Sequence, residues 1–205
     1  SIVIIGGSSD IAKSTISSIS TENYKFHALV RDDSHTDDLS ALGVNVILGD
    51  ATSEEDIKNF ISGVKESGEI HAILHCVGSF AVRPPHAMNK EAFEAVISTN
   101  LTSAFLTLSI AGKAMLSQGH GRMVFMSSVA GSLGLVNHEA ISAAKGGIES
   151  MVRSAAATYA NRGLRINAVA PGLTDTKLAS PIMSNETASQ AASQKIPVKR
   201  IGRKE

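Results

Sequence analysis

The sequence has little of three things: cysteine, net charge and long apolar runs. A single cysteine, Cys76, excludes an internal disulfide framework and is typical of a reducing compartment, so we expect a cytoplasmic location. Nineteen basic residues balance 19 acidic ones, so no overall field favours nucleic acid or an anionic membrane as a partner. No apolar run is expected to span a bilayer, and the apolar residues 1–6 lack the features of a signal peptide.

The composition is that of an ordinary globular chain, with 43% hydrophobic and 19% charged residues over 205 positions. Short apolar runs alternate with longer helical patterns, which is typical of a parallel sheet with crossover helices. We therefore predict an α/β fold, a doubly wound parallel sheet (Rossmann fold) with helices on both faces, forming one domain over residues 1–205. Strands are expected at 1–6, 25–31, 44–49, 70–76, 122–128 and 164–170, and helices near 10–20, 36–42, 53–67, 89–117 and 138–162.

The last part of the chain follows a different pattern. From Leu173 onwards it is rich in Ser, Ala and Thr and is interrupted by Pro181 and Pro197. Short helices over a site, or a mobile flap, suit this composition, and so does an irregular terminus. The sequence leaves these alternatives open.

The first strand-to-helix turn, "GGSSDIA" (residues 6–12), lies where an open parallel sheet binds a pyrophosphate. Gly6 permits a tight turn, and Ser8 and Ser9 add hydroxyl donors. An aspartate and an alanine occupy the two later positions of the generic three-glycine pattern. Asp10 suits a phosphate site only if its side chain turns away to cap the helix. An ordinary strand-to-helix turn would have the same composition.

The end of the second predicted strand bears on the choice of cofactor. A carboxylate there would bind the 2′-hydroxyl of NAD, whereas the sequence has Val30 followed by Arg31. A guanidinium pairs well with a 2′-phosphate, so we expect NADP rather than NAD. Asp32 and Asp33 follow and would weaken this preference if they paired with the arginine, and a surface arginine at a strand end is also common.

Seven motifs follow one another along the chain: "GGSSDIA" (6–12), "GDA" (49–51), "HCVG" (75–78), "STNLTSAF" (98–105), "MSSVAG" (126–131), "AAK" (143–145) and "NAVAPGLTDT" (167–176). In this order and spacing they resemble the short-chain dehydrogenase/reductase family over the whole chain. The resemblance implies a nicotinamide cofactor, with adenine near the third-strand motif and the nicotinamide amide near the last. The cofactor-binding residues that it implies, together with Arg31, are Gly6, Ser8, Ser9, Ile11, Asp50, Ala51, Gly78, Lys145, Pro171, Gly172, Thr174 and Thr176.

The resemblance also implies a set of catalytic residues. In the family a tyrosine hydroxyl transfers the proton, a lysine lowers the pKa of that hydroxyl and holds the ribose, a serine polarises the carbonyl, and an asparagine anchors a water chain. Asn100, Ser128 and Lys145 match three of these four residues. Ile141 stands where the tyrosine is expected, so the usual proton carrier is missing.

His138 is a candidate replacement, because enoyl reductases of the same family carry their tyrosine seven residues before the lysine. Seven residues make nearly two helical turns, which puts His138 and Lys145 on one face. We expect Asn137 to cap the helix, leaving His138 in the first turn, where the helix dipole disfavours imidazolium. His138 would otherwise be a polar residue at the helix start. A water relay through Ser128, Lys145 and Asn100 is a second route, and no reaction at all is a third.

Two functions follow from these residues. The first is an NADP-dependent oxidoreductase acting on a small carbonyl, alcohol or enone with a non-tyrosine proton donor. The second is a catalytically inactive NADP-binding protein, a sensor or an oligomeric partner, and Ile141 favours it. We expect no metal site, since His71 and His75 would be about 13 Å apart along their strand.

The surroundings of the site are expected from the same resemblance. Apolar residues near 79–87, near 133–136 and after Leu173 would line the pocket of a small-molecule substrate, with Arg83 as a possible anion contact. The predicted helices at 89–117 and 138–162 are rich in small residues, and in the family they form a homodimer or homotetramer interface. Packing on the sheet would select the same residues. Family members also continue through a last helix and strand, which this sequence lacks.

Overall fold

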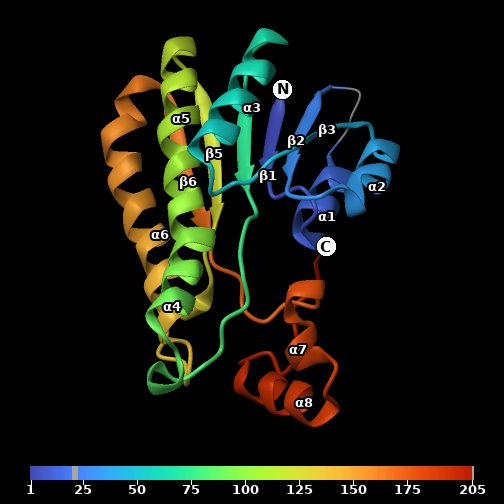
Figure 1. Cartoon of the computed structure of the whole chain (residues 1–205), viewed down its shortest axis with the longest axis vertical. Helices are drawn as coiled ribbons and strands as arrows, with labels where there is room; N and C mark the ends of the chain where they lie inside the picture. Colours follow the sequence, from blue (N-terminus) through green and yellow to red (C-terminus); the bar gives the residue numbers. More distant parts are fainter. Residues whose placement is uncertain (20–22, 205) are drawn as a thin grey trace.

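The computed structural model describes residues 1–19 and 23–204, and a six-stranded parallel sheet runs through its centre (Figure 1). The strand order is β3-β2-β1-β4-β5-β6, so the chain crosses back over β1 after the third strand. All six predicted strands are confirmed, to within two residues at each end, as β1 (Ile2–Ile5), β2 (Phe26–Val30), β3 (Val44–Leu48), β4 (Ala72–His75), β5 (Gly121–Met126) and β6 (Leu164–Val169).

The helices pack on both faces of the sheet, as predicted. The helices α1 (Asp10–Ser18) and α2 (Thr36–Ala41) cover β1–β3 on one face, with Ile4 and Phe26 in the cluster that they form. The helices on the other face are α3 (Glu54–Glu66), α5 (Ser103–Gln118) and α6 (Glu139–Tyr159). Because most strands are buried on both faces, their sequences are nearly continuous apolar runs rather than alternating ones.

The predicted helix at 89–117 is a single long segment with an irregular middle. It runs from α4 (Lys90–Ile97) through a π-helical turn (Ser98–Thr102) into α5. By length and composition the segment Lys90–Gln118 qualifies as a membrane span, so the expectation that no such segment exists was wrong. This is weak evidence for a membrane, because 44% of its apolar window is buried and α5 packs against the sheet core.

The chain after β6 forms short helices, one of the alternatives left open by the sequence. A 3-10 turn (Lys177–Ala179) leads into α7 (Ser180–Met183) and α8 (Glu186–Lys195), which lie beyond the carboxyl ends of the strands (Figure 1). The chain then returns, and Gly202 pairs with Thr174 in a parallel bridge. The backbone of Gly202 donates to Leu173 O at 2.9 Å and accepts from Asp175 N at 2.9 Å. Backbone hydrogen bonds therefore hold the two ends of the segment 173–202 together.

Candidate active site

The turn between β1 and α1 depends on two glycines. Gly6 has a φ of +84°, and a Cβ there would lie 2.9 Å from the side chain of Val77. At Gly7 an added Cβ would lie 2.7 Å from the Cβ of Ala28. The turn therefore packs tightly between β2 and the segment after β4. Ser8, Ser9 and Ile11 are half-buried beside it, with Ser9 as the N-cap residue of α1.

The side chain of Asp10 points away from the turn between β1 and α1. It does not cap α1, which the sequence had suggested. Its Oδ2 accepts a hydrogen bond from the backbone N of Lys177, at 2.6 Å. The segment after β6 folds back so that the 3-10 turn Lys177–Ala179 begins beside α1. The N–H of Lys177, at the start of that turn, has no partner within the turn and is available to Asp10. Asp10 therefore ties the first turn to the tail.

A pocket of about 530 Å³ lies at this junction. It brings the predicted cofactor residue Thr176 next to the first turn, while Thr174 hydrogen-bonds to Gly172 O at 3.2 Å. The basic residues of this pocket were not predicted from the sequence. The charged segment "RIGRKE", which contains Arg203 and Lys204, could have indicated them. Cationic side chains outnumber carboxylates in this pocket, which suits a pyrophosphate. The lining residues are Asp10, Asp175, Thr176, Lys177, Arg203 and Lys204.

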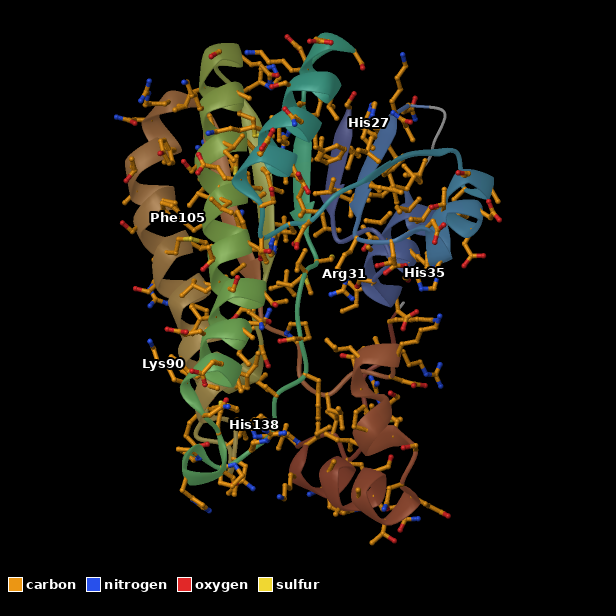
Figure 2. All side chains as sticks on the ribbon, viewed as in Figure 1. His27, Arg31, His35, Lys90, Phe105 and His138 are labelled. Atoms are coloured by element: carbon orange, nitrogen blue, oxygen red, sulfur yellow. The ribbon has the colours of Figure 1, made fainter. Side chains whose placement is uncertain are left out.

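Arg31 is exposed directly after β2, beside α1 (Figure 2). Within the described part of the chain it forms no ion pair, because Asp32 instead caps a 3-10 turn by accepting from Ser34 N at 3.2 Å. Close by, Lys13 pairs with Asp38 at 3.0 Å. The guanidinium is thus free to bind an anion.

The third-strand motif is held by its own hydrogen bonds. One carboxylate oxygen of Asp50 accepts from the N–H and the hydroxyl of Thr52, both at 2.8 Å, and Asp50 N donates to Asp56 Oδ2 at 2.7 Å. Ala51 packs against the main core. The second oxygen of Asp50 keeps capacity for another donor.

Asn100 lies fully buried in the π-helical turn, and every part of its amide is used. Its Nδ2 donates to Ser79 Oγ at 2.8 Å and to Val96 O at 2.9 Å, while its Oδ1 accepts from Ser79 N at 3.2 Å. The side chain thus fixes the segment after β4. A Cβ at Gly78 would lie 3.3 Å from Asn100 Oδ1 and 3.6 Å from Lys145 Nζ, so these three residues meet at one point.

Lys145 is 7% exposed in the middle of α6. Its Nζ donates to Met126 O at 2.8 Å, its only hydrogen bond within residues 1–19 and 23–204. Burial lowers the pKa of this ammonium to about 8, with a smaller opposing effect from the nearby Cys76. The thiol of Cys76 stays protonated, because burial raises its pKa to about 12. Lys145 is therefore a buried cation that gives up its proton more easily than an exposed lysine.

Ser128 follows β5 and begins a 3-10 turn (Val129–Gly131). Its Oγ accepts from Ala130 N at 3.2 Å, which leaves the hydroxyl proton for another acceptor. Val129 N donates to Pro171 O at 3.0 Å, so the turn is tied to the Pro171–Gly172 segment after β6. Two of the sequence-predicted segments are thus joined directly.

Ile141, four residues before Lys145, is 8% exposed and belongs to an apolar cluster. Its buried companions are Val96, Ala130, Ala140 and Ala144. From its place in α6, the Ile141 side chain therefore packs against α4 and the turn after Ser128. This position supports hydrophobic packing and offers no proton carrier.

His138 was expected in the first helical turn behind Asn137, and this was wrong. Asn137 has a φ of +63°, and His138 itself is the N-cap residue of α6, without a side-chain cap. The backbone turns at Asn137, whose carbonyl accepts from Arg83 N at 2.8 Å. The Nδ1 of His138 donates to Val136 O at 2.7 Å, so the neutral ring keeps an unprotonated Nε2. Figure 2 shows His138 beyond the strand ends, on the α4 side.

Apolar side chains stand exposed on the predicted walls. The contact between Arg83 and Asn137 joins the segment after β4 to the one after β5. Val136 is 80% exposed, and each of the others is more than a third exposed: Phe80, Val82, Leu133 and Leu135. Such a surface binds apolar groups.

The histidines on β4 and beside it lie apart from the residues described above. His75 is fully buried, its Nε2 lies 3.0 Å from Ser103 Oγ, and burial lowers its pKa to about 3. His71 lies at the opposite, amino-terminal end of β4, near Ser1. Within the described residues no group of three His, Cys, Asp or Glu side chains is placed to bind a metal.

The strand order and the residues at the carboxyl edge define a dinucleotide-binding Rossmann protein. The profile of a family described as enoyl-(acyl carrier protein) reductase matches residues 6–205. The 3-oxoacyl-(acyl-carrier-protein) reductase MabA of Mycobacterium tuberculosis is 30% identical over 203 residues, which cover 98% of this chain and 79% of the relative. The chain belongs to the short-chain dehydrogenase/reductase family, as its motifs indicated.

Two further similarities support this membership. The cis-4-hydroxycyclohexanecarboxylate dehydrogenase of Sinomonas cyclohexanicum is 35% identical over 158 residues, which are 76% of this chain and 63% of that enzyme. The crystal structure of levodione reductase has a TM-score of 0.90 at 27% identity, covering 99% of this chain and 85% of the other. The matched part of this chain thus spans 63% to 79% of the curated relatives named here.

Proposed function

We propose that the protein is an NADP-dependent oxidoreductase that transfers hydride between nicotinamide and a small carbonyl, alcohol or enone. The observation that carries this proposal is the meeting of Asn100, Gly78 and the buried Lys145, whose Nζ donates to Met126 O, two residues before Ser128. A buried ammonium with one backbone partner costs stability, so a bound ligand explains this burial better than folding does.

The chain's residues fit the cofactor. Gly6 and Gly7 let the first turn pack closely at the carboxyl edge of the sheet, where its backbone N–H groups would bind the pyrophosphate, and the pocket with Lys177 and Arg203 supplies cations. The free guanidinium of Arg31 suits a 2′-phosphate, which favours NADP over NAD. We assign the remaining contacts to Ser8, Ser9, Ile11, Asp50, Ala51, Gly78, Lys145, Pro171, Gly172, Thr174 and Thr176. When bound, the cofactor supplies or accepts the hydride at its nicotinamide ring.

The polar residues of the site would act on the substrate oxygen. The Ser128 hydroxyl, which has a proton to donate, would hydrogen-bond to that oxygen and stabilise the negative charge that develops on it. Lys145 would hold the ribose and add a positive charge nearby. Asn100 would keep the segment at Ser79 in place beneath them.

The proton needs another carrier, and His138 is our candidate. Since its Nδ1 is committed to Val136 O, only Nε2 is free to exchange a proton with a substrate. For reduction the ring would have to be imidazolium, whereas for alcohol oxidation the neutral Nε2 is already a base. A water relay through Ser128 and Lys145 is the alternative route.

A second candidate function is a catalytically inactive NADP-binding protein, acting as a sensor or an oligomeric partner. The burial of Ile141 in an apolar cluster favours it, because that position now contributes to packing. This function uses the same cofactor residues and needs no proton carrier.

We further propose a cytoplasmic protein of one domain, residues 1–205, that assembles as a homodimer or homotetramer. The outer faces of α4–α5 and α6 would form the interface. Phe105 on α5 is 57% exposed there (Figure 2), among small side chains. The substrate would be a small molecule held by the apolar walls around Val136.

The test is to titrate the full-length protein with NADPH and NADH and to follow NADPH consumption with ketones, aldehydes and enones. Tight NADPH binding with turnover supports the oxidoreductase, and the preferred bond distinguishes C=O from C=C reduction. Binding without turnover favours the inactive function, and no binding rejects both. Arg31→Ala should weaken NADPH binding about 10-fold but NADH binding little. Arg162→Ala, an exposed arginine elsewhere, is the control.

A further inference from the structure

A carboxylate on α6 connects the two ends of the turn that carries Ser128. Glu149 lies one helical turn beyond Lys145. Its Oε1 accepts from Ser127 Oγ at 2.8 Å and its Oε2 accepts from Ser132 Oγ at 2.7 Å. These hydroxyls, that of Ser132 first, hold the pKa of Glu149 below its ordinary value. The ionised carboxylate therefore bridges both sides of Ser128.

The turn and the helix also touch through their backbones. A Cβ at Gly131 would lie 2.8 Å from Glu149 Oε1 and 2.9 Å from Gly146 N, so only a glycine permits this approach. Ser127 Oγ is also within 3.1 Å of Lys145 O. The helix segment that carries Lys145 is thus the surface on which the turn rests.

The turn has further attachments: Ser127 N donates to Val169 O at 2.7 Å, and Ala130 belongs to the apolar cluster of Ile141. Val129 N donates to Pro171 O at 3.0 Å, in the segment after β6. Ser128 therefore stands between a backbone contact on one side and the Glu149 carboxylate on the other. Loss of the carboxylate would leave Ser127 and Ser132 without their shared acceptor and would free the turn to move away from α6.

We propose that Glu149 is a positioning residue that holds the turn bearing Ser128 against the helix bearing Lys145. The proposal rests on the oxidoreductase function proposed above. Its importance follows from geometry, because a hydroxyl that stabilises a developing charge must keep its distance from the reacting oxygen to within a few tenths of an ångström. Glu149 itself does not contact the cofactor or the substrate in this assignment.

The test compares Glu149→Gln and Glu149→Ala with the unmodified full-length protein. Amide hydrogen exchange, which needs no substrate, should speed up about 10-fold at residues 129–133 in the alanine variant and less in the glutamine variant. Exchange in β1 and β2 should not change. On a substrate that turns over, kcat should fall about 10- to 100-fold while the Kd for NADPH stays within about 3-fold. Glu66→Ala, an exposed glutamate of α3, is the control.

The outcomes are separable. Unchanged exchange at 129–133 overturns the role of Glu149, whether or not turnover is found. Faster exchange throughout the chain, with lower melting temperature and weaker NADPH binding, also overturns it, because the effect would then be global stability. If the unmodified protein turns over no substrate, the oxidoreductase proposal fails, and local faster exchange would still establish that Glu149 holds the turn.

Discussion

The polar and the apolar parts of the site are held in opposite ways. Asn100 and Lys145 are buried polar groups hydrogen-bonded to backbone atoms of Ser79, after β4, and of Met126, the last residue of β5. Ile141, on the same helix as Lys145, is instead part of a hydrophobic cluster. One turn of α6 therefore separates a residue whose burial costs stability from one whose burial adds to it.

The difference indicates which part of the site needs a bound ligand to offset the cost of its burial. Burying a lysine with one backbone acceptor is unfavourable unless a bound group repays it. Burying an isoleucine needs no ligand. We therefore expect ligand binding to depend on the polar part, and the nature of the chemistry to depend on the residues around position 141.

The largest effect should come from removing the buried charge. Lys145→Met keeps much of the side-chain volume, and we expect turnover to fall about 10²- to 10⁴-fold and NADPH binding to weaken about 10-fold. Steady-state kinetics and a binding titration measure these. Lys65→Met, on the exposed face of α3, should change neither. Normal turnover in Lys145→Met would remove the functional distinction between the two parts of the site.

The next effect distinguishes the two proton routes. If His138 carries the proton, His138→Ala should lower kcat about 100-fold and leave NADPH binding intact. If a water relay through Ser128 does, Ser128→Ala should be the severe variant and His138→Ala a mild one. pH-dependent kinetics of the two variants, side by side, decide between these routes. Equally mild variants would argue that neither side chain carries the proton.

A smaller effect, in this case an increase in activity, should follow from introducing a hydroxyl at position 141. Ile141→Tyr adds volume to a packed cluster, which should cost about 1–3 kcal/mol in the free energy of unfolding. The same change should raise ketone reduction if Ser128 and Lys145 are still correctly placed. Denaturant unfolding and NADPH consumption measure the two effects, and Ile141→Phe is the control for size. No gain over the phenylalanine variant would show that the polar part is not competent by itself.

The last effect is a gradual one, a pH dependence of stability. The folded-state pKa of Lys145 is about 8, below its ordinary 10.5, so between these values the unfolded chain binds more protons. Stability should therefore rise with pH through this window, by an amount on the order of 3 kcal/mol from this residue. Urea unfolding at pH 7.5 to 10 should show a flatter profile in Lys145→Met than in the unmodified protein. Parallel profiles would mean that Lys145 is not desolvated.

The sequence predicted the architecture well, because the strands and helices depend on local patterns. Six apolar runs became the six strands, and the spacing from Ile141 to Lys145 placed both residues in one helix. The helix start was predicted less well. Asn137 is a good cap by residue type, but it has a left-handed conformation and its carbonyl accepts from Arg83 N, and His138 takes the N-cap position without a side-chain cap.

By itself the sequence determined the fold class and the family, since both depend on residue types at fixed spacing. Only the tertiary structure decided which distant groups meet. The partner of Asp10 is Lys177, 167 positions away, and Glu149 reaches both ends of the Ser128 turn. The carbonyl of Val136 likewise determines that Nδ1 of His138 donates a hydrogen bond and that Nε2 stays free. Such contacts depend on where the chain returns in space, which local residue patterns do not encode.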